Sequence, residues 1–457
     1  MEMAEGVKIG LEVHIYPRTV SKMYCSCSSD FLNASPNSRI CPVCSGQPGS
    51  KPMPPNRRCI EAGLMIAAAL GMSAAGAPVR TLRKHYFYPD LPSNYQRTAE
   101  PMATGGSLHG FALGEIHWEE DPGQYDMAKG RVDLNRSGVP LLELVTEPSM
   151  HRPQDAMDAL DDLLLLLQYL EIDRRELPFK VDTNVSVAGG ERVEVKNINS
   201  VNGVVRALEF EISRQSSLLE GGGRVEMETR HFDEIGGRTV SMRYKETSEG
   251  YRYMADPDML PVDLKSVSVS CPENPFAILA RMKDGGVREE DARVIISDRR
   301  LLSVYDSAAA VTGARFASVF VARDIVGELN FRKLPSCFID GTLIGQLLPL
   351  ASAVHGGRLS NSNASKLLRS AFDGRDIAPE LAKMEGVFAG RDAISAVADE
   401  VIASEKEAVA RYRKGSSGSL NFLVGLCMKK LGGKAKAGEI IAVLRSRLDG
   451  AGDQEMK

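Results

Sequence analysis

The stretch Gly10-Leu11-Glu12-Val13-His14-Ile15 decides how the rest of the chain is interpreted. Its strict alternation of apolar and polar residues predicts a β-strand with Glu12 and His14 on one face and apolar side chains on the other. Four later segments, 114–121, 139–148, 181–187 and 192–196, alternate in the same way. We therefore predict one sheet with an apolar back and a polar front.

The predicted front of the sheet concentrates acidic residues and histidines. The register of segment 114–121 is open, because its front face carries either His117, Glu119 and Asp121 or Trp118 and Glu120. The other strands contribute Glu143, Glu147, Asp182, Asn184, Ser186, Arg192, Glu194 and Lys196.

Two interpretations of this front compete. A polar face on an antiparallel strand is most often simply wetted by solvent. Solvated faces, however, mix Lys, Thr, Ser and Glu, whereas this front concentrates the oxygen and imidazole ligands that hard divalent cations prefer. Because clustered carboxylates repel one another unless a cation lies among them, the sharper hypothesis is a Mg²⁺ site that serves phosphate chemistry.

Length and composition describe an ordinary water-soluble chain. Its 457 residues, 43% hydrophobic and 25% charged, are enough for two to four domains. No apolar run approaches the length of a membrane span, and the N-terminus lacks a signal or transit pattern. We expect a cytoplasmic protein, or one in an organelle matrix if a targeting segment has been removed. The net charge of −4 gives no global sign of nucleic-acid binding but leaves room for a local basic surface.

Four of the eight cysteines form two close pairs. Cys25 and Cys27 are followed, after thirteen residues, by Cys41 and Cys44. This spacing predicts a structural Zn²⁺ site in a loop-rich corner beside the first strand. Two disulfides are the alternative, which the absence of an export signal disfavours.

Two further segments carry side chains suited to phosphate or a base. The aromatic segment 85–95 follows Arg83 and Lys84, and it either stacks a base or anchors its own loop, the second being the more common use of such residues. Arg136 lies beside a Gly-containing turn and is a candidate clamp for phosphate or carboxylate.

The remaining pattern is helical. Segments 57–72 and 202–219 have apolar residues at helical spacing and are expected to pack behind the sheet. Strand alternation ends near Pro272–Pro275, and segments 282–310, 363–372 and 379–384 then predict helices. The fold class is therefore α+β, a sheet domain followed by an all-α part.

The last helical segment is basic. Between Arg411 and Arg447 there are nine basic residues and one acid. Such runs are often only solvated helix faces. Here four lysines flank a Gly-Gly turn, where they could converge on a phosphate backbone: Lys429, Lys430, Lys434 and Lys436.

Several of these motifs occur together, and in order, in one known family. The runs are IGLEVHI (9–15), CSC and CPVC (25–44), RKHYFYPDLPSNYQ (83–96), HWEEDPG (117–123), DLNRSGVPLLELVTEP (133–148), DTNVSV (182–187), RVEVKNINS (192–200) and YRYMADPD (251–258). From Ile9 to about Pro261 the chain resembles the B subunits of the tRNA-dependent amidotransferases (the GatB family), and the resemblance continues more weakly into the helical half.

The resemblance implies a function. In that family a heterotrimer, made of the GatB chain, an amidase and a small third chain, converts Glu-tRNA(Gln) or Asp-tRNA(Asn) to the amide. ATP phosphorylates the side-chain carboxylate, and ammonia from the amidase then displaces phosphate. The implied fold is an antiparallel cradle resembling glutamine synthetase over residues 1–274, a helical domain over 275–389 and a basic tail domain over 390–457.

The resemblance also implies site residues. The positions that match the family's catalytic and Mg²⁺-binding residues are Glu12, His14, Glu119, Glu120 and Glu147, with the choice between Glu119 and Glu120 left open. Residue type and strand face add Arg136, Asn184 and Lys196 as contacts for phosphate or substrate. The family's helical and tail domains contact tRNA, which favours that role for the four lysines of the tail.

Two other classes of protein would fit parts of the pattern. A stand-alone metal-dependent phosphohydrolase would use the same carboxylates without a partner, and a non-catalytic zinc-stapled scaffold would bind tRNA without turning over ATP. The residues do not distinguish Glu-tRNA(Gln) from Asp-tRNA(Asn) as substrate.

Overall fold

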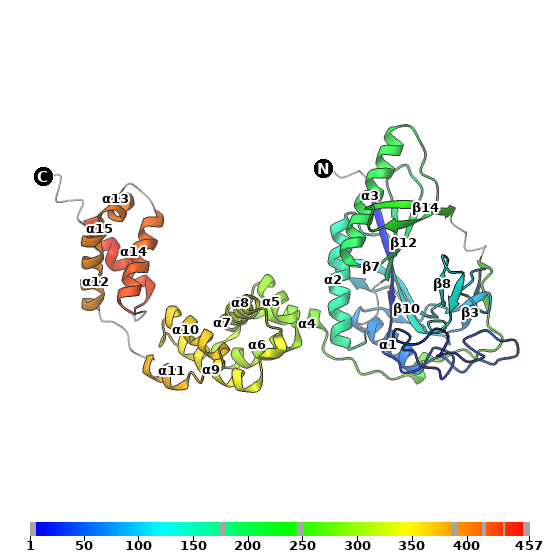
Figure 1. The fold of residues 1–457 in the computed structure, drawn as a ribbon, viewed down its shortest axis with the longest axis horizontal. Coiled ribbons are helices and arrows are strands. Elements are labelled where there is room, and N and C mark those ends of the chain that lie inside the picture. The colour runs from blue at the N-terminus through cyan, green and yellow to red at the C-terminus, as the bar shows by residue number, and fades with distance from the viewer. Residues whose placement is uncertain are drawn as a thin grey trace. The chain divides into compact units, whose positions relative to one another are not determined.

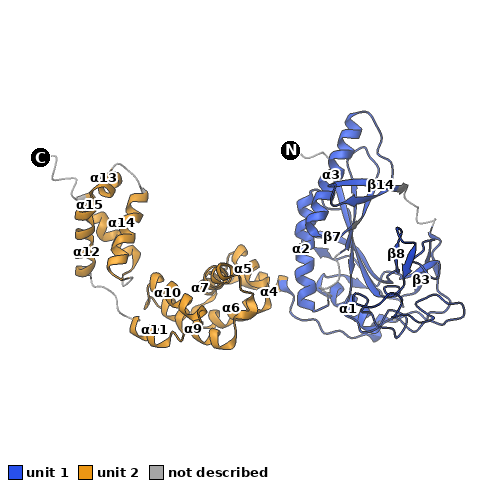
Figure 2. Cartoon of the chain, viewed as in Figure 1, with its two compact units in different colours: residues 1–275 blue, residues 276–457 orange. Residues whose placement is uncertain are grey.

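The computed structural model describes residues 6–172, 180–244, 251–384, 391–413, 417–432 and 435–450. The chain folds as two compact units, Met1–Pro275 and Phe276–Lys457 (Figure 2). The predicted further boundary near residue 390 falls beside residues 385–390, which lie outside the described ranges. Among the helices that are described, none combines the length and apolar character that crossing a bilayer requires.

The first unit is built on a 13-stranded sheet that is almost entirely antiparallel, with β12 and β13 as a parallel pair. Its strand order is β14 (Arg238–Tyr244), β13 (Glu228–Asp233), β12 (Val193–Ile198), β11 (Lys180–Ser186), β1 (Lys8–Ile15), β10 (Pro140–Thr146), β7 (Phe111–Glu120), β4 (Tyr95–Ala99), β3 (Thr81–His85) and β15 (Met254–Ala255). The short strands β5 (Ala103–Thr104) and β6 (Ser107–Leu108) pair with β7, and β2 (Ser73–Ala74) pairs with β5. A separate hairpin joins β8 (Gln124–Asp126) to β9 (Arg131–Asp133).

The alternation seen in the sequence is present in the sheet. All five predicted strands exist, as β1, β7, β10, β11 and β12, and they are neighbours in one sheet. In β1, Ile9, Leu11 and Val13 are at most 1% exposed, whereas Glu12 and His14 are partly exposed on the opposite face. The sheet therefore has the apolar back and polar front that the sequence predicts.

Three helices cover the apolar back (Figure 1). They are α1 (Arg57–Ala69), α2 (Pro153–Leu170) and α3 (Val201–Glu220). Side chains cap α1 and α3, since Asn56 accepts from the amides of Arg58 and Cys59 and Ser200 accepts from the amide of Gly203. Helix α2, which the sequence analysis did not predict, begins at a proline and buries a stripe of leucines against the core.

The second unit is entirely helical in the residues that are described, as predicted. The predicted helix over 282–310 is divided by turns into α4 (Pro275–Asp284), α5 (Glu289–Ile296) and α6 (Arg299–Thr312). The second unit continues with α7 (Ala314–Val319), a π-helical stretch η3 (Phe320–Ile325), α8 (Val326–Arg332), α9 (Gly341–His355), α10 (Asn361–Phe372), α11 (Ala378–Met384), α12 (Arg391–Ser404), α13 (Lys406–Arg413), α14 (Ser417–Lys430) and α15 (Ala437–Gly450). Helices α12 to α15 share an apolar core of their own, centred on Leu423, Cys427 and Leu444.

One tight turn fastens the edge of the sheet to α1. Gly106 has φ +83°, and a Cβ there would lie 2.5 Å from the carbonyl oxygen of Leu70. We expect Gly106→Ala to lower the free energy of unfolding by about 1–3 kcal/mol more than Gly105→Ala does. Gly105 is the matched control, because its φ is +71° but a Cβ there would meet nothing within 4 Å. Denaturant titration of both variants measures the difference, and equal midpoints would contradict the proposed close approach.

Candidate active site

A cavity of about 310 Å³ opens on the polar front of the sheet, in the first unit. Residues of five adjacent strands, β12, β11, β1, β10 and β7, line it, and residues of β3, β4, β13 and β14 and of the connecting loops complete the lining. Its lining is Glu12, His14, Lys84, Tyr86, Tyr88, Asp90, Gln96, Glu119, Asp121, Pro122, Arg136, Leu141, Glu143, Lys180, Asp182, Lys196, Thr229, Met242 and Tyr251. The cavity therefore combines many carboxylates with four cationic side chains.

The first acidic cluster joins three strands. His14 on β1 lies opposite Glu143 on β10, and Glu119 on β7 is the third member. One ligand atom from each residue lies within 4.8 Å of the others, with His14 Nε2 at 3.9 Å from Glu143 Oε2. An imidazole nitrogen and two carboxylates at this spacing suit a hard divalent cation.

His117 contacts Glu143 of this cluster and also Glu115. Its register partner is Glu143, and its Nε2 lies 3.6 Å from Glu143 Oε2 while Nδ1 lies 3.5 Å from Glu115 Oε1. Burial opposes a charge on the ring, but these two carboxylates raise the pKa of His117 to about 10. The imidazolium in turn lowers the pKa of Glu143 against the effect of burial, so Glu143 stays ionised.

The second cluster is formed by Glu12 and by residues of β11 and β12. Glu12 on β1 is opposite Asp182 on β11, and Glu194 on β12 completes a group whose ligand atoms lie within 4.8 Å of one another. Lys196 contributes its ammonium, 2.9 Å from Asp182 Oδ2 and 3.1 Å from Glu194 Oε1. Asn184 donates to Glu12 Oε1 at 2.8 Å, which orients that carboxylate.

Repulsion between neighbouring carboxylates is concentrated in the two clusters. Burial, and after it the charge of Glu143, raises the pKa of both Glu12 and Glu119, and the charge of Glu194 adds to the effect on Glu12. Carboxylates packed in this way are stabilised by a bound cation, since it replaces repulsion with attraction. The donor atoms and their charge therefore fit one divalent ion in each cluster.

The cations lie around the same cavity. Arg136 donates to the carbonyl oxygens of Pro122 and Gly123, at 2.9 and 2.6 Å, and lies 3.3 Å from Asp121. Lys84 places its ammonium 5.0 Å from the ring centre of Tyr251. Side chains of this type can bind the oxygens of a phosphate chain.

The structure brings together most of the predicted site residues but not all of them. Glu12, His14 and Glu119 meet at the cavity, and Arg136 and Lys196 line it, with Asn184 beside Glu12. Glu120 faces the opposite way and accepts a hydrogen bond from the backbone of Arg97 at 3.0 Å. Glu147 is exposed beyond the end of β10, where the register shifts between Val145 and Thr146. Neither belongs to a metal-like cluster in the described residues.

Three carboxylates that were not selected belong to the two clusters. Glu143, Asp182 and Glu194 were on predicted polar faces but were not selected as ligands. The alternation in the sequence predicted that each of these residues lies on a polar face. Choosing them as ligands also requires knowing which residues pair across strands. The sequence indicated Lys84 only as a cation beside the aromatic segment, and Gln96, which was not selected, donates to Glu119 Oε1 at 3.0 Å.

The four cysteines form a third group. The Sγ atoms of Cys25, Cys27, Cys41 and Cys44 lie within 4.8 Å of one another. A tetrahedral Zn²⁺ with Zn–S bonds of about 2.3 Å would place its sulfurs about 3.8 Å apart, and Cys41 Sγ lies 3.9 Å from Cys44 Sγ. The group therefore fits a closed metal site, with all four cysteines free in this structure.

The second unit holds the predicted basic residues and a larger cavity. Lys429 and Lys430 are exposed at the end of α14, with Lys430 paired to Glu400, and Lys436 is exposed just before α15. Lys434 lies outside the described residues.

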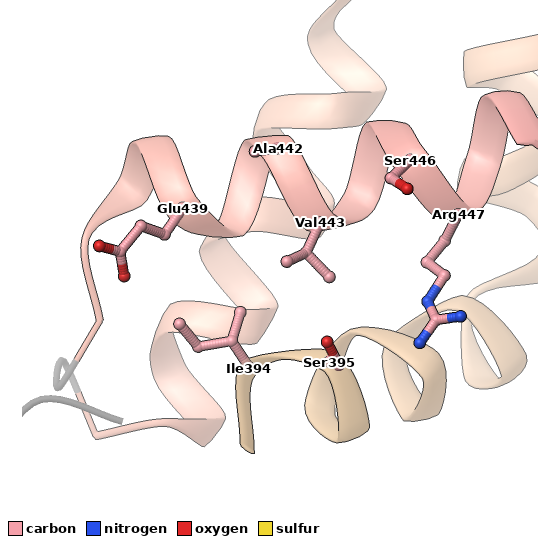
Figure 3. A pocket seen from close by; sticks show the side chains of 7 residues that line it. All are labelled: Ile394, Ser395, Glu439, Ala442, Val443, Ser446 and Arg447. Atoms are coloured by element: carbon pink, nitrogen blue, oxygen red, sulfur yellow. The ribbon is translucent and has the colours of Figure 1, made fainter. Parts of the chain in front are cut away.

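The larger cavity, of about 630 Å³, opens between α12 and α15 (Figure 3). Arg447 in its lining is paired with Asp399. Within the ranges that the structure describes, no metal-like cluster of side chains lies at this cavity. The cavity on the sheet is therefore the candidate active site.

Comparison with known proteins agrees with this architecture. Residues 7–270 match the family described as the GatB/GatE catalytic domain, and residues 304–448 match the family described as the GatB domain. The chain belongs to the GatB family. The GatB/GatE catalytic domain covers the sheet unit with both acidic clusters and the cysteine group.

Curated members of the GatB family are similar to this chain over almost their whole length. Proteins named as the B subunit of aspartyl/glutamyl-tRNA(Asn/Gln) amidotransferase are 39% identical in Methanothermobacter thermautotrophicus, 37% in Methanocaldococcus jannaschii and 40% in Methanopyrus kandleri. The alignments cover 97%, 97% and 98% of this chain, and 100%, 98% and 99% of those proteins. The family resemblance in the motifs is thus confirmed over both units.

Loss of one cysteine tests the metal site. We expect Cys41→Ser to reduce bound zinc and to lower the melting temperature of the sheet unit by about 5 °C or more, since a closed site needs all four thiolates. Elemental analysis and calorimetry measure the two effects, with Cys337→Ser, an exposed lone cysteine in the second unit, as the control. A variant that keeps both its zinc and its melting temperature would refute the assignment.

Proposed function

We propose that this chain is the B subunit of a glutamine-dependent aspartyl/glutamyl-tRNA(Asn/Gln) amidotransferase, a ligase that forms a C–N bond. The observation that carries the proposal is the pair of neighbouring acidic clusters, of whose six residues all but Glu194 line one cavity, within a domain that matches the GatB/GatE catalytic family. The names of its relatives add the substrate class, mischarged tRNA.

The reaction explains why such a cavity is needed. A side-chain carboxylate is a poor electrophile, because its leaving group would be an oxide. Transfer of the γ-phosphoryl group of ATP to this oxygen forms an acyl phosphate and ADP. Ammonia then attacks the carbonyl carbon, phosphate leaves, and the nitrogen loses a proton to give the amide. Catalysis of the first step depends on positioning and on stabilising the charge of the phosphate oxygens.

The two clusters would hold the divalent ions that accompany ATP. His14, Glu119 and Glu143 would be the ligands of one, and Glu12, Asp182 and Glu194 would be those of the other. Bound Mg²⁺ supplies positive charge that shields the phosphates. Glu120 and Glu147 are left out of these ligand sets because they lie away from both clusters.

The remaining polar residues have roles that follow from their contacts. Arg136, fixed by the carbonyls of Pro122 and Gly123, presents its guanidinium to a phosphate at the cavity wall. Lys196 and Asn184 hold the second cluster in shape, and Lys84 adds a charge facing Glu119 and Glu143.

The rest of the chain would serve the substrate and the partners. We propose a cradle like that of glutamine synthetase over residues 1–274, a helical domain over 275–389 and a tail domain over 390–457. The tail lysines Lys429, Lys430, Lys434 and Lys436 would contact the tRNA backbone. An amidase and a small third chain would complete a cytoplasmic heterotrimer, with the amidase as the source of ammonia.

Phosphate release from ATP tests the function. The purified chain, reconstituted with its amidase partner, is expected to release phosphate only when Mg²⁺ and Glu-tRNA(Gln) or Asp-tRNA(Asn) are both present. Parallel reactions with each mischarged tRNA identify the substrate. Binding of tRNA without turnover would favour the scaffold, and hydrolysis of free phosphodiesters would favour a phosphohydrolase.

A matched pair of glutamates tests the ligand sets. We expect Glu143→Gln to lower tRNA-dependent phosphate release about a hundredfold or more, because it removes a charge from the first cluster without changing its size. Glu147→Gln, just beyond the end of the same strand and outside the cluster, should retain turnover. Equal losses in the two variants, with normal folding by circular dichroism, would rule out the assignment of Glu143.

A further inference from the structure

Lys22 is a buried cation between the cysteine group and the turn that carries Arg136. Lys22 is only 1% exposed. Burial of an ammonium is costly unless it is paired and hydrogen-bonded. Its Nζ lies 3.4 Å from Cys44 Sγ and donates to the carbonyl oxygen of Leu134 at 3.2 Å. One side chain thus links two segments that are far apart in the sequence.

The cysteine group gives this cation an electrostatic role. Four thiolates around a divalent metal leave a net negative charge in a half-buried corner of the protein. The ammonium of Lys22, within hydrogen-bonding distance of one of the sulfurs, compensates part of that charge. Hydrogen bonds and charges outside the ligand shell typically change metal affinity about 10–100-fold.

The other end of the link is the turn that carries Arg136. Leu134 begins this turn, and Gly138 ends it with its carbonyl accepting from the amide of Met23 at 2.7 Å. Ser137 Oγ donates to the carbonyl oxygen of Cys44 at 2.9 Å. The turn is therefore fastened to the cysteine group on one side, and Arg136 extends from it to line the cavity on the other.

We propose that Lys22 is a positioning residue that couples the metal-bearing cysteine group to the phosphate-binding site through the turn that holds Arg136. Loss of the ammonium weakens metal binding at the sulfurs and loosens the turn, so that Arg136 holds phosphate less well. The part concerning phosphate rests on the proposed function, whereas the part concerning the metal does not.

The test compares Lys22→Met with Lys51→Met in the full chain. Lys51 is an exposed lysine close to the cysteines in the sequence and is the matched control. Zinc affinity is measured by competition with a chromophoric chelator, and Lys22→Met is expected to weaken it about tenfold or more. An affinity equal to that of Lys51→Met would overturn the link to the sulfur.

A double-mutant cycle tests the link to Arg136. In the complex with the amidase partner, Lys22→Met is expected to raise KM for ATP more than it lowers kcat, and to raise KM no further in an Arg136→Met background. Additive effects on KM would overturn the coupling, since they would show that Lys22 acts independently of Arg136.

A second variant covers the case in which Lys22→Met does not fold. Ser137→Ala removes the bond to Cys44 from the same turn without removing a charge, and it is expected to raise KM for ATP only when Arg136 is present. Additivity with Arg136→Met would again overturn the proposal. If the wild-type complex shows no tRNA-dependent turnover, the proposed function fails, while zinc affinity still decides the role of Lys22 at the sulfurs.

Discussion

The antiparallel register of β11, β1, β10 and β7 is the constraint on which the first unit depends. It places His14 opposite Glu143, and Glu12 opposite Asp182, so that polar residues scattered over the chain meet on one surface. Such an arrangement of like charges costs free energy. The cost is offset by the other face of the same strands, where alternate side chains are buried under α1, α2 and α3. The alternation of side chains between the two faces of each strand therefore both assembles the site and stabilises it.

The irregular segments complete what the sheet alone cannot provide. The sheet supplies the clustered carboxylates and the cations Lys84, Lys180 and Lys196, but Arg136 comes from a turn, and turns have fewer backbone bonds to hold them in place. Here the turns are fastened by buried polar contacts: Tyr16 donates to Asp121 at 2.7 Å, and Arg97 donates to the fully buried Asp256 at 2.7 Å. The cysteine group likewise holds segments together, in a part of the chain that has almost no helix or strand.

Local features of the sequence could be predicted, and pairings between distant segments could not. Alternation gave the five strands and the two faces, because side-chain direction depends only on neighbours along the chain. Glu143 and Glu147 have the same parity, yet β10 ends at Thr146, so Glu147 lies beyond the strand and outside the cluster that Glu143 joins. The choice between Glu119 and Glu120 was in principle decidable, since Trp118 and Ile116 are the large apolar residues that the core must bury. Asp182 and Glu194 needed knowledge of which strands are adjacent.

The placement of both clusters on β1 has a further consequence for the site. Glu12 and His14 are two residues apart on the same face, and the charge of Glu143 in the first cluster raises the pKa of Glu12 in the second. A change of charge at His14, Glu119 and Glu143 is therefore felt at Glu12, and because coupling between two sites is reciprocal, a change of charge at Glu12 is felt at Glu143. The two clusters are in this sense one site, with β1 as their shared strand.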